Sequence, residues 1–268
     1  MAPLHFGPVA FDAGLIIFDK DGTLAHFEPI WQHIYLSAID AVTKEVDNPG
    51  VIRAELNATL GYTPAPAHPL APGRFSTHGP FATAANAAIG TIVAAVLYRH
   101  SQPPLSWDEA VALAGRTFLA EMDKPLDPAL LTAPTDLPTL FGSLRAAGIA
   151  VAVITSDERA PTLYTLEHFG LGEEVEFIIA SDDPYPKKPA PEAIWAACAH
   201  YGVPVERAVM VGDSLTDMRM GRAAGVGLCV GVLTGPASRE ELETLAHVVL
   251  ASIGEITGDR GQCRTVIC

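Results

Sequence analysis

Residues Leu15 to Leu24 place an apolar run directly before a loop that carries two carboxylates. The run is Leu15, Ile16, Ile17 and Phe18, and the loop begins with Asp19, Lys20, Asp21, Gly22 and Thr23. Four apolar residues that stop at a charged loop with a glycine predict a buried strand. Ligands of open α/β sheets bind at the carboxyl edge of the strands, so both carboxylates are expected at such an edge. The first hypothesis is that Asp19 acts as a nucleophile.

From Leu137 onward, short apolar strands alternate with helices. Strands are predicted over 149–154, 176–180, 208–211, 227–231 and 248–250, and helices over 140–147, 160–169, 191–201, 215–224 and 239–245. This alternation is typical of right-handed βαβ units in a parallel sheet. The opening strand belongs to the same sheet. The expected fold class is α/β, with a Rossmann-like, doubly wound parallel sheet as its core.

The residues between these two parts, from Phe27 to about Asp136, show helical periodicity and no convincing strand. Helices are predicted over 30–42, 51–60, 81–100 and 107–122, with a capping box from Ser106 to Glu109, and the proline-rich stretch 63–80 is expected to be an irregular loop. The predicted domains are therefore a discontinuous catalytic core, 1–25 and 137–268, and an all-helical cap domain, 26–136.

Charge and composition narrow the class of partner. A formal net charge of -14 argues against nucleic acid or an anionic membrane, because phosphate backbones require Lys and Arg. A small anionic substrate needs local cations, helix N-termini or a metal. The first residues do not resemble a signal peptide, the apolar stretch 82–98 is too interrupted to span a membrane, and the four cysteines lack zinc or disulfide spacing. We expect a cytoplasmic enzyme; its oligomeric state is left open.

Polar residues follow two further predicted strands. Thr155 and Ser156 come after the strand 149–154, where a hydroxyl and free N–H groups can hold a phosphate oxygen or cap a helix. Lys187 and Lys188 precede Pro189 after the strand 176–180. A lysine held before a proline can supply a fixed positive charge, and the alternative is that both lysines are solvated in a surface loop.

A second acidic pair follows the strand 208–211. Asp213 lies at the strand tip and Asp217 one helical turn later, so both carboxylates can face one hard cation. The alternative is that Asp213 or Ser214 only caps the helix. The residue pairs that follow these four strands are all expected at one edge of one sheet. They are Asp19 with Asp21, Thr155 with Ser156, Lys187 with Lys188, and Asp213 with Asp217.

These ordered motifs resemble those of the haloacid dehalogenase superfamily, in its phosphoglycolate phosphatase-like branch with a helical cap. The matching residues are Phe18 to Leu24, Thr155 with Ser156, Lys188 followed by Pro189 and Pro191, and Gly212 to Asp217. The resemblance covers the core, whereas the cap matches only in its position and helicity. The similarity implies a phosphatase that hydrolyses a small phosphomonoester, such as phosphoglycolate or a sugar phosphate.

The resemblance also implies a role for each motif residue. Asp19 would form an aspartyl-phosphate, and Asp21 would be the general acid and base. Thr155 and Ser156 would bind the phosphoryl group, and Lys188 would steady its charge and that of Asp19. Mg²⁺ would be bound by Asp19, Asp213 and the backbone carbonyl of Asp21, with Asp217 in its water shell.

Some features stay open at this point. His26 stands where many capped relatives have an acidic residue, and Lys187 is an alternative to Lys188, although Pro189 favours the latter. A phosphosugar mutase, a dehalogenase and a non-enzymatic binding protein are rival functions. A phosphonatase would need a reactive cap lysine, and neither Lys44 nor Lys124 has a telling context. Candidate contacts to the leaving group, each more simply explained as core or exposed, are His26, Phe27, Trp31, His68, Arg74 and His78.

Overall fold

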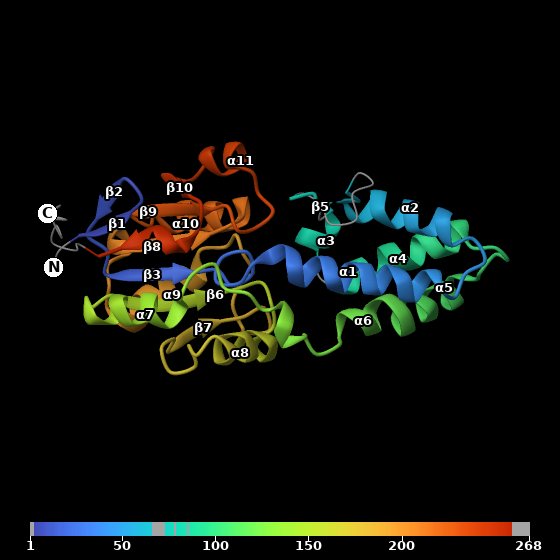
Figure 1. Ribbon diagram of the computed structural model, residues 1–268, viewed down its shortest axis with the longest axis horizontal. Helices are drawn as coiled ribbons and strands as arrows, with labels where there is room; N and C mark the ends of the chain where they lie inside the picture. Colours follow the sequence, from blue (N-terminus) through green and yellow to red (C-terminus); the bar gives the residue numbers. More distant parts are fainter. Residues whose placement is uncertain (1–2, 66–72, 78, 85, 259–268) are drawn as a thin grey trace, which may run out of the picture. The chain divides into compact units, whose positions relative to one another are not determined.

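The computed structural model describes residues 3–65, 73–77, 79–84 and 86–258 (Figure 1). The chain separates into two compact units, one formed by Met1–Phe27 with Leu131–Cys268 and the other by Glu28–Leu130. Each unit is described by itself below.

The first unit is built on a parallel sheet of six strands in the order β10-β9-β8-β3-β6-β7 (Figure 1). The strands are β3 Leu15–Phe18, β6 Ala150–Ile154, β7 Phe177–Ile179, β8 Ala208–Gly212, β9 Leu228–Val232 and β10 Val248–Leu250. Strand β3 pairs with β6 on one side and with β8 on the other, and Phe18 lies opposite Val153 and Val211. The predicted α/β class and parallel sheet are confirmed.

Helices cover both faces of this sheet, because alternate residues of each strand point to opposite sides. The helices are α7 Leu137–Ala146, α8 Arg159–His168, α9 Glu192–Tyr201, α10 Leu215–Ala224 and α11 Arg239–Glu243. Ile16 and Phe18 of β3 share one core with apolar residues of α7 and α8. Leu15 and Ile17 share a second core with those of α9, α10 and α11. The result is a sheet between two helical layers.

A small antiparallel sheet, which the sequence did not predict, adds to the first unit. It contains β1 Leu4–Phe6, β2 Val9–Phe11 and β11 Ile256–Thr257, in the order β11-β1-β2. Leu4, Phe6 and Ile256 are buried in the same core as Phe18. Strands of two or three residues carry too little alternation to be recognised from sequence.

In the described residues of the second unit, the regular structure is helical apart from one short strand pair. Its helices are α1 Phe27–Thr43, α2 Pro49–Leu60, α3 Pro80–Thr83, α4 Asn86–His100, α5 Trp107–Ala114 and α6 Ala120–Met122, and a π-helical segment, Gly115–Leu119, joins α5 to α6. The predicted capping box from Ser106 to Glu109 is present at the start of α5. The predicted helix over 81–100 is wrong at its start, because Ala84 is extended and separates α3 from α4.

The expectation of a purely helical insert with an irregular loop over 63–80 also needs correction. Strands β4 Tyr62–Thr63 and β5 Arg74–Phe75 form an antiparallel pair at the two ends of the proline-rich stretch. The pair is held by packing, since Tyr62 and Phe75 both lie against the buried ring of Tyr35, at centroid distances of 4.7 and 5.4 Å. His68 and His78 lie outside the described residues.

Short 3-10 turns complete the chain at Pro128–Leu130, Val205–Arg207 and Ile253–Glu255. Among the described residues, no helix combines the length and the apolar character that crossing a membrane requires.

Two leucines on helix α8 test the packing of this helix against the sheet. Leu166 of α8 is buried against the sheet, whereas Leu163 on the same helix is 46% exposed. Leu166→Ala should lower the free energy of unfolding by about 2–5 kcal/mol, because it leaves a cavity in the core. Leu163→Ala should change it by less than about 1 kcal/mol. Urea unfolding followed by circular dichroism measures both, and equal losses would contradict this packing.

Candidate active site

The predicted site residues of the core meet at the carboxyl edge of the sheet. Asp19 follows β3, Thr155 follows β6 and Asp213 follows β8, and all three side chains are buried. Backbone bonds extend the strand register into these ends: Asp19 N donates to the carbonyl of Val211 at 2.9 Å, and Thr155 N donates to that of Ile179 at 2.9 Å. The order of the strands therefore brings residues from distant parts of the chain to one place.

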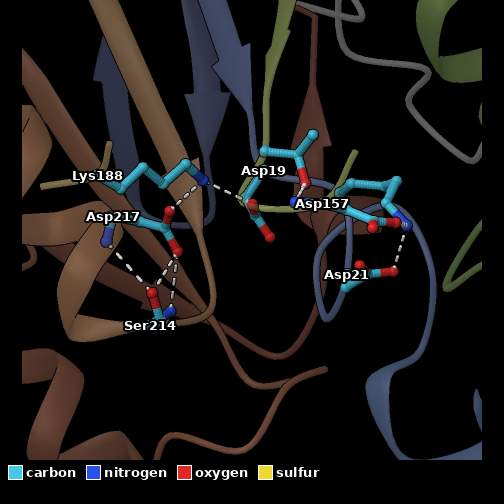
Figure 2. A network of polar contacts seen from close by, with 8 residues as sticks. Asp19, Asp21, Asp157, Lys188, Ser214 and Asp217 are labelled. Carbon is cyan, nitrogen blue, oxygen red and sulfur yellow. Dashed lines mark hydrogen bonds and ion pairs between the residues drawn. The ribbon is translucent and has the colours of Figure 1, made fainter. Parts of the chain in front are cut away.

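Lys188 is the cation that faces Asp19 (Figure 2). Its Nζ lies 2.6 Å from Asp19 Oδ1 and 2.7 Å from Asp217 Oδ1, and its side chain is only 4% exposed. Lys187 is exposed. Burial lowers the pKa of the Lys188 ammonium, but the two carboxylates outweigh it and hold that pKa above its ordinary value. Of the two lysines, Lys188 is thus the one placed beside Asp19.

Asp217 is fixed by the start of helix α10. Ser214 is the N-cap, and its Oγ accepts from Asp217 N at 3.2 Å while Asp217 Oδ2 accepts from Ser214 N and Oγ at 3.2 and 2.6 Å. This capping box holds one carboxylate oxygen, and Lys188 holds the other. Ser214, and not Asp213, is the helix cap, so the Asp213 carboxylate is left for another role.

Three buried carboxylates form an acidic cluster. One oxygen from each of Asp19, Asp213 and Asp217 lies within 4.8 Å of the others. Lys188 pairs with Asp19 and Asp217, and across the described residues no lysine or arginine forms an ion pair with Asp213. Oxygen donors at this spacing suit a hard divalent cation. The cluster therefore fits a metal such as Mg²⁺.

Two glycines make room for the Asp213 carboxylate. A Cβ added to Gly235 would lie 1.7 Å from Asp213 Oδ2, and one added to Gly22 would lie 2.3 Å from it. Gly22 also has a φ of 82°, a left-handed conformation that favours glycine. Any side chain at either position would push the carboxylate out of the cluster.

Burial and the repulsion of neighbouring carboxylates raise the pKa values of Asp19 and Asp213. Burial raises the pKa of Asp19 to about 7, against the attraction of Lys188. Burial also raises the pKa of Asp213, and the charges of Asp19 and Asp217 add to that effect. Asp19 and Asp213 thus bind protons more readily than exposed carboxylates when no cation is present.

Asp21 lies on the other side of Asp19 from Lys188 (Figure 2). Its Oδ1 accepts from Lys20 Nζ at 2.8 Å, and Lys20 Nζ also lies 2.9 Å from Asp157 Oδ2. The Asp21 side chain is 14% exposed and is not part of the acidic cluster. Burial raises the pKa of Asp21, although Lys20 opposes the increase. A carboxyl group with a raised pKa is suited to general acid chemistry.

Thr155 and Ser156 differ in their surroundings. Thr155 is buried, and its Oγ1 accepts from Asp157 N at 3.0 Å. Ser156 is exposed. Neither residue caps α8, because that helix begins at Arg159 after Glu158. Thr155 is consequently the hydroxyl placed at the sheet edge with Asp19.

Lys20 and Asp157 are site residues that the sequence reasoning missed. A signal existed for Lys20, because a lysine at the end of an apolar strand needs carboxylate partners if it is buried. Asp157 could not be paired with it from sequence, since the contact depends on β6 lying beside β3.

The candidate residues for leaving-group contacts are described only in part. Trp31 packs edge-to-face on Phe81, with ring centroids 6.0 Å apart. Arg74 is exposed. His26 N donates to the carbonyl of Thr132 at 2.9 Å, and Phe27 N donates to that of Thr234 at 3.4 Å. These bonds describe the chain just past the first motif and assign no contact to a substrate.

Parts of the chain are similar in sequence to curated phosphatases. Phosphoglycolate phosphatase from Rhodospirillum rubrum is 34% identical over 123 residues, which are 44% of this chain and 50% of that protein. N-acetylmuramic acid 6-phosphate phosphatase from Pseudomonas aeruginosa is 30% identical over 98 residues, 36% of this chain and 43% of that protein. The chain thus spans about half or less of the length of these relatives.

A solved structure and a family match cover more of the chain. The crystal structure of CbbY from Rhodobacter sphaeroides, in complex with phosphate, is 25% identical with a TM-score of 0.52, over 91% of this chain and 96% of that one. Residues 14–225 match the haloacid dehalogenase-like hydrolases. Because that match includes the strands that carry Asp19, Thr155 and Asp213, the chain belongs to the haloacid dehalogenase-like hydrolase family.

Proposed function

We propose that the protein is a Mg²⁺-dependent phosphomonoester hydrolase that forms an aspartyl-phosphate on Asp19. The observation that carries this proposal is the buried ion pair between Lys188 and Asp19 beside an acidic cluster. A nucleophile at a strand end, a fixed cation and a cation-binding group of carboxylates are what phosphoryl transfer requires.

In the first step, the Asp19 oxygen that Lys188 does not hold attacks phosphorus. The bond between phosphorus and the alcohol oxygen breaks, and Asp21 gives its proton to that leaving oxygen. In the second step, Asp21 takes a proton from water as the water oxygen attacks the phosphorus of the aspartyl-phosphate. Asp19 is restored as a carboxylate, and inorganic phosphate leaves.

Lys188 and Thr155 support the charge of the phosphoryl group. Lys188 keeps one Asp19 oxygen in place through the 2.6 Å contact and lies close enough to offset charge on the transferring group. Thr155 places a hydroxyl at the same sheet edge. Ser156 was expected to assist, and its exposure favours Thr155 as the main hydroxyl.

Asp19, Asp213 and the backbone carbonyl of Asp21 would hold Mg²⁺, and Asp217 would act through its water shell. When bound, the ion supplies positive charge that offsets the repulsion between the cluster and an anionic substrate. The support for this assignment is that the capping box and Lys188 occupy both oxygens of Asp217, whereas Asp213 has neither kind of partner among the described residues.

The acidic cluster favours phosphoryl chemistry over the rival functions. A dehalogenase with the same nucleophile has no need of a general acid or of a buried cation site, yet Asp21 lies beside Asp19 and Asp213 is buried at this edge. A phosphosugar mutase would use the same groups, and it differs in releasing an isomeric phosphosugar instead of inorganic phosphate. A binding protein gains nothing from an unpaired buried carboxylate, which destabilises the fold.

The substrate we propose is a small phosphorylated metabolite, either a phosphoglycolate-like acid or a sugar phosphate. The names of the two curated relatives support these two classes. We further propose that the unit Glu28–Leu130 is the cap domain, inserted after the first motif. A screen of phosphomonoesters for release of inorganic phosphate, with Mg²⁺ and with EDTA, tests the proposal directly; no release from any ester would overturn it.

Substitutions of Asp19, Lys188 and Lys187 should differ sharply in their effect on turnover. Asp19→Asn should lower turnover of 4-nitrophenyl phosphate at least about 10³-fold, because the amide is not a nucleophile. Lys188→Met should lower it about 10²- to 10³-fold, since a fixed charge at the transferring group is lost.

The matched control is Lys187→Met, which removes an exposed lysine and should change turnover less than about twofold. Steady-state release of nitrophenolate measures all three. Equal losses in the two lysine variants would contradict the assignment of Lys188.

Mg²⁺ should stabilise the protein more at about pH 8 than at about pH 5.5, because it competes with protons for the cluster. The pKa of Asp19 is raised to about 7 in the folded state, so the metal-free protein gains stability from this group below the unfolded pKa and loses it as pH rises through 7. At about 100 times its Kd, the ion should add about 2.7 kcal/mol. Thermal melting with and without Mg²⁺ measures the difference.

Asp213→Asn gives the complementary test. This change removes a buried charge that lacks a cationic partner, so the metal-free variant should melt no lower than the wild type at about pH 8. The stabilisation by Mg²⁺ should disappear. An unchanged Mg²⁺ effect in this variant would exclude Asp213 as a ligand.

A further inference from the structure

Lys20 is a buried lysine that the proposed mechanism does not use. It lies between Asp19 and Asp21 in the chain, and its side chain is 3% exposed. Its ammonium contacts Asp21 Oδ1 at 2.8 Å and Asp157 Oδ2 at 2.9 Å. Since burying a long cationic side chain is costly, its placement against these carboxylates calls for a physical explanation.

The backbone of Lys20 anchors the loop that carries Asp21. Its carbonyl accepts from the N–H groups of Thr23, Leu24 and Ala25 at 3.3, 2.8 and 3.1 Å. Gly22 N donates to the carbonyl of Ala25 at 2.7 Å, which closes the loop further. The backbone of Lys20 is therefore fixed by the loop, which limits the positions from which its ammonium can contact Asp21 and Asp157.

Asp157 is held even more firmly than Lys20. Its N–H donates to Thr155 Oγ1 at 3.0 Å, and its carbonyl accepts from Ser181 N at 2.7 Å. Its Oδ1 accepts from Glu158 N at 2.8 Å, which leaves Oδ2 for Lys20. Both ends of the residue and both oxygens of its carboxylate are thus engaged. Asp157 is a fixed anchor on the neighbouring strand end.

Asp21, in contrast, depends on Lys20. Across the described part of the chain, Lys20 is the one side chain that bonds the Asp21 carboxylate, and it bonds a single oxygen. Without this contact, rotation about χ1 and χ2 would be free to move the carboxyl group away from the edge where Asp19 and Thr155 lie. A general acid must stay within hydrogen-bond reach of the leaving oxygen.

We propose that Lys20 and Asp157 form a positioning pair, in which Asp157 fixes the Lys20 ammonium and Lys20 holds Asp21 Oδ1 so that Oδ2 faces the leaving oxygen. This inference rests on the proposed phosphatase function. Asp157 thereby gives the segment after β6 a role in acid catalysis, in addition to the phosphoryl-binding role of the Thr155 hydroxyl. Neither residue touches the substrate; both act through Asp21.

The test compares two esters of similar size whose leaving groups differ in their need for a proton. Benzyl phosphate releases a strongly basic alkoxide unless it is protonated, whereas 4-nitrophenyl phosphate releases a stable anion. The ratio kcat/KM covers the steps up to departure of this group, so it reports on Asp21 as an acid and not on the later attack of water. Asp21→Asn provides the reference, with a loss mainly for benzyl phosphate.

Lys20→Met should reproduce this selective loss. We expect kcat/KM for benzyl phosphate to fall about 10- to 100-fold and that for 4-nitrophenyl phosphate to fall less than about threefold. Asp157→Asn should act in the same direction, by about threefold to tenfold, since a neutral amide holds the ammonium less firmly than a carboxylate. The control is Lys124→Met, which removes an exposed ion pair with Glu121 and should change neither value.

Thermal melting of each variant accompanies the kinetics. If Lys20→Met does not fold, Asp157→Asn and the double variant Lys20→Met with Asp157→Asn decide the question, because the double variant no longer leaves two facing carboxylates unpaired. Equal losses for both esters, or no loss for benzyl phosphate, in the folded variants would overturn the positioning role. A wild-type protein that hydrolyses neither these two esters nor any ester of the phosphomonoester screen, or an Asp21→Asn variant that hydrolyses both normally, would instead overturn the proposed function, and with it the positioning role.

Discussion

The structure of this protein depends on how buried negative charge is balanced at the carboxyl edge of the central sheet. Asp19, Asp21, Asp157, Asp213 and Asp217 gather there, and two lysines form the ion pairs recorded for them in the described part of the chain. Each buried carboxylate without a partner costs several kcal/mol. Each lysine neutralises a different pair of carboxylates: Lys188 forms ion pairs with Asp19 and Asp217, and Lys20 forms ion pairs with Asp21 and Asp157. Asp213 alone has no cationic partner among the described residues, and this is where a divalent cation offers most stabilisation.

The order of the strands makes this division possible. Strand β3 lies between β6 and β8, so Asp19 has Thr155 on one side and Asp213 on the other. In the mechanism we propose, residues after β8 and in the loop after β7 would supply the metal ligands and the cation Lys188, whereas those after β6 would supply the phosphoryl-binding hydroxyl of Thr155 and the anchor Asp157. Glycines at 22 and 235 leave space for Asp213, and the capping box of α10 fixes Asp217. Packing of the sheet core thus sets the geometry of the chemistry.

Most of the site could be predicted from sequence because its residues follow strands that have strong apolar patterns. Asp19, Thr155 and Asp213 were each expected at a strand end, and each lies there. The pairing of Lys20 with Asp157 was out of reach, because it depends on which strands are neighbours and not on where each strand ends. The choice between Lys187 and Lys188 needed side-chain geometry. The pairs β1–β2 and β4–β5 were missed because strands this short are stabilised by buried rings such as Phe6 and Tyr62, and not by a periodic pattern.

The two lysines impose different requirements on the residues around them. In the mechanism we propose, Lys188 holds one oxygen of Asp19 and leaves the other free to attack phosphorus, while its second partner, Asp217, is engaged on both oxygens. In the same proposed mechanism, Lys20 would hold a group, Asp21, that exchanges a proton in each half of the reaction. A lone lysine beside Asp21 would favour the carboxylate and oppose its role as an acid. Asp157 shares the ammonium and weakens that preference, so the same residue that anchors Lys20 also keeps Asp21 able to carry a proton.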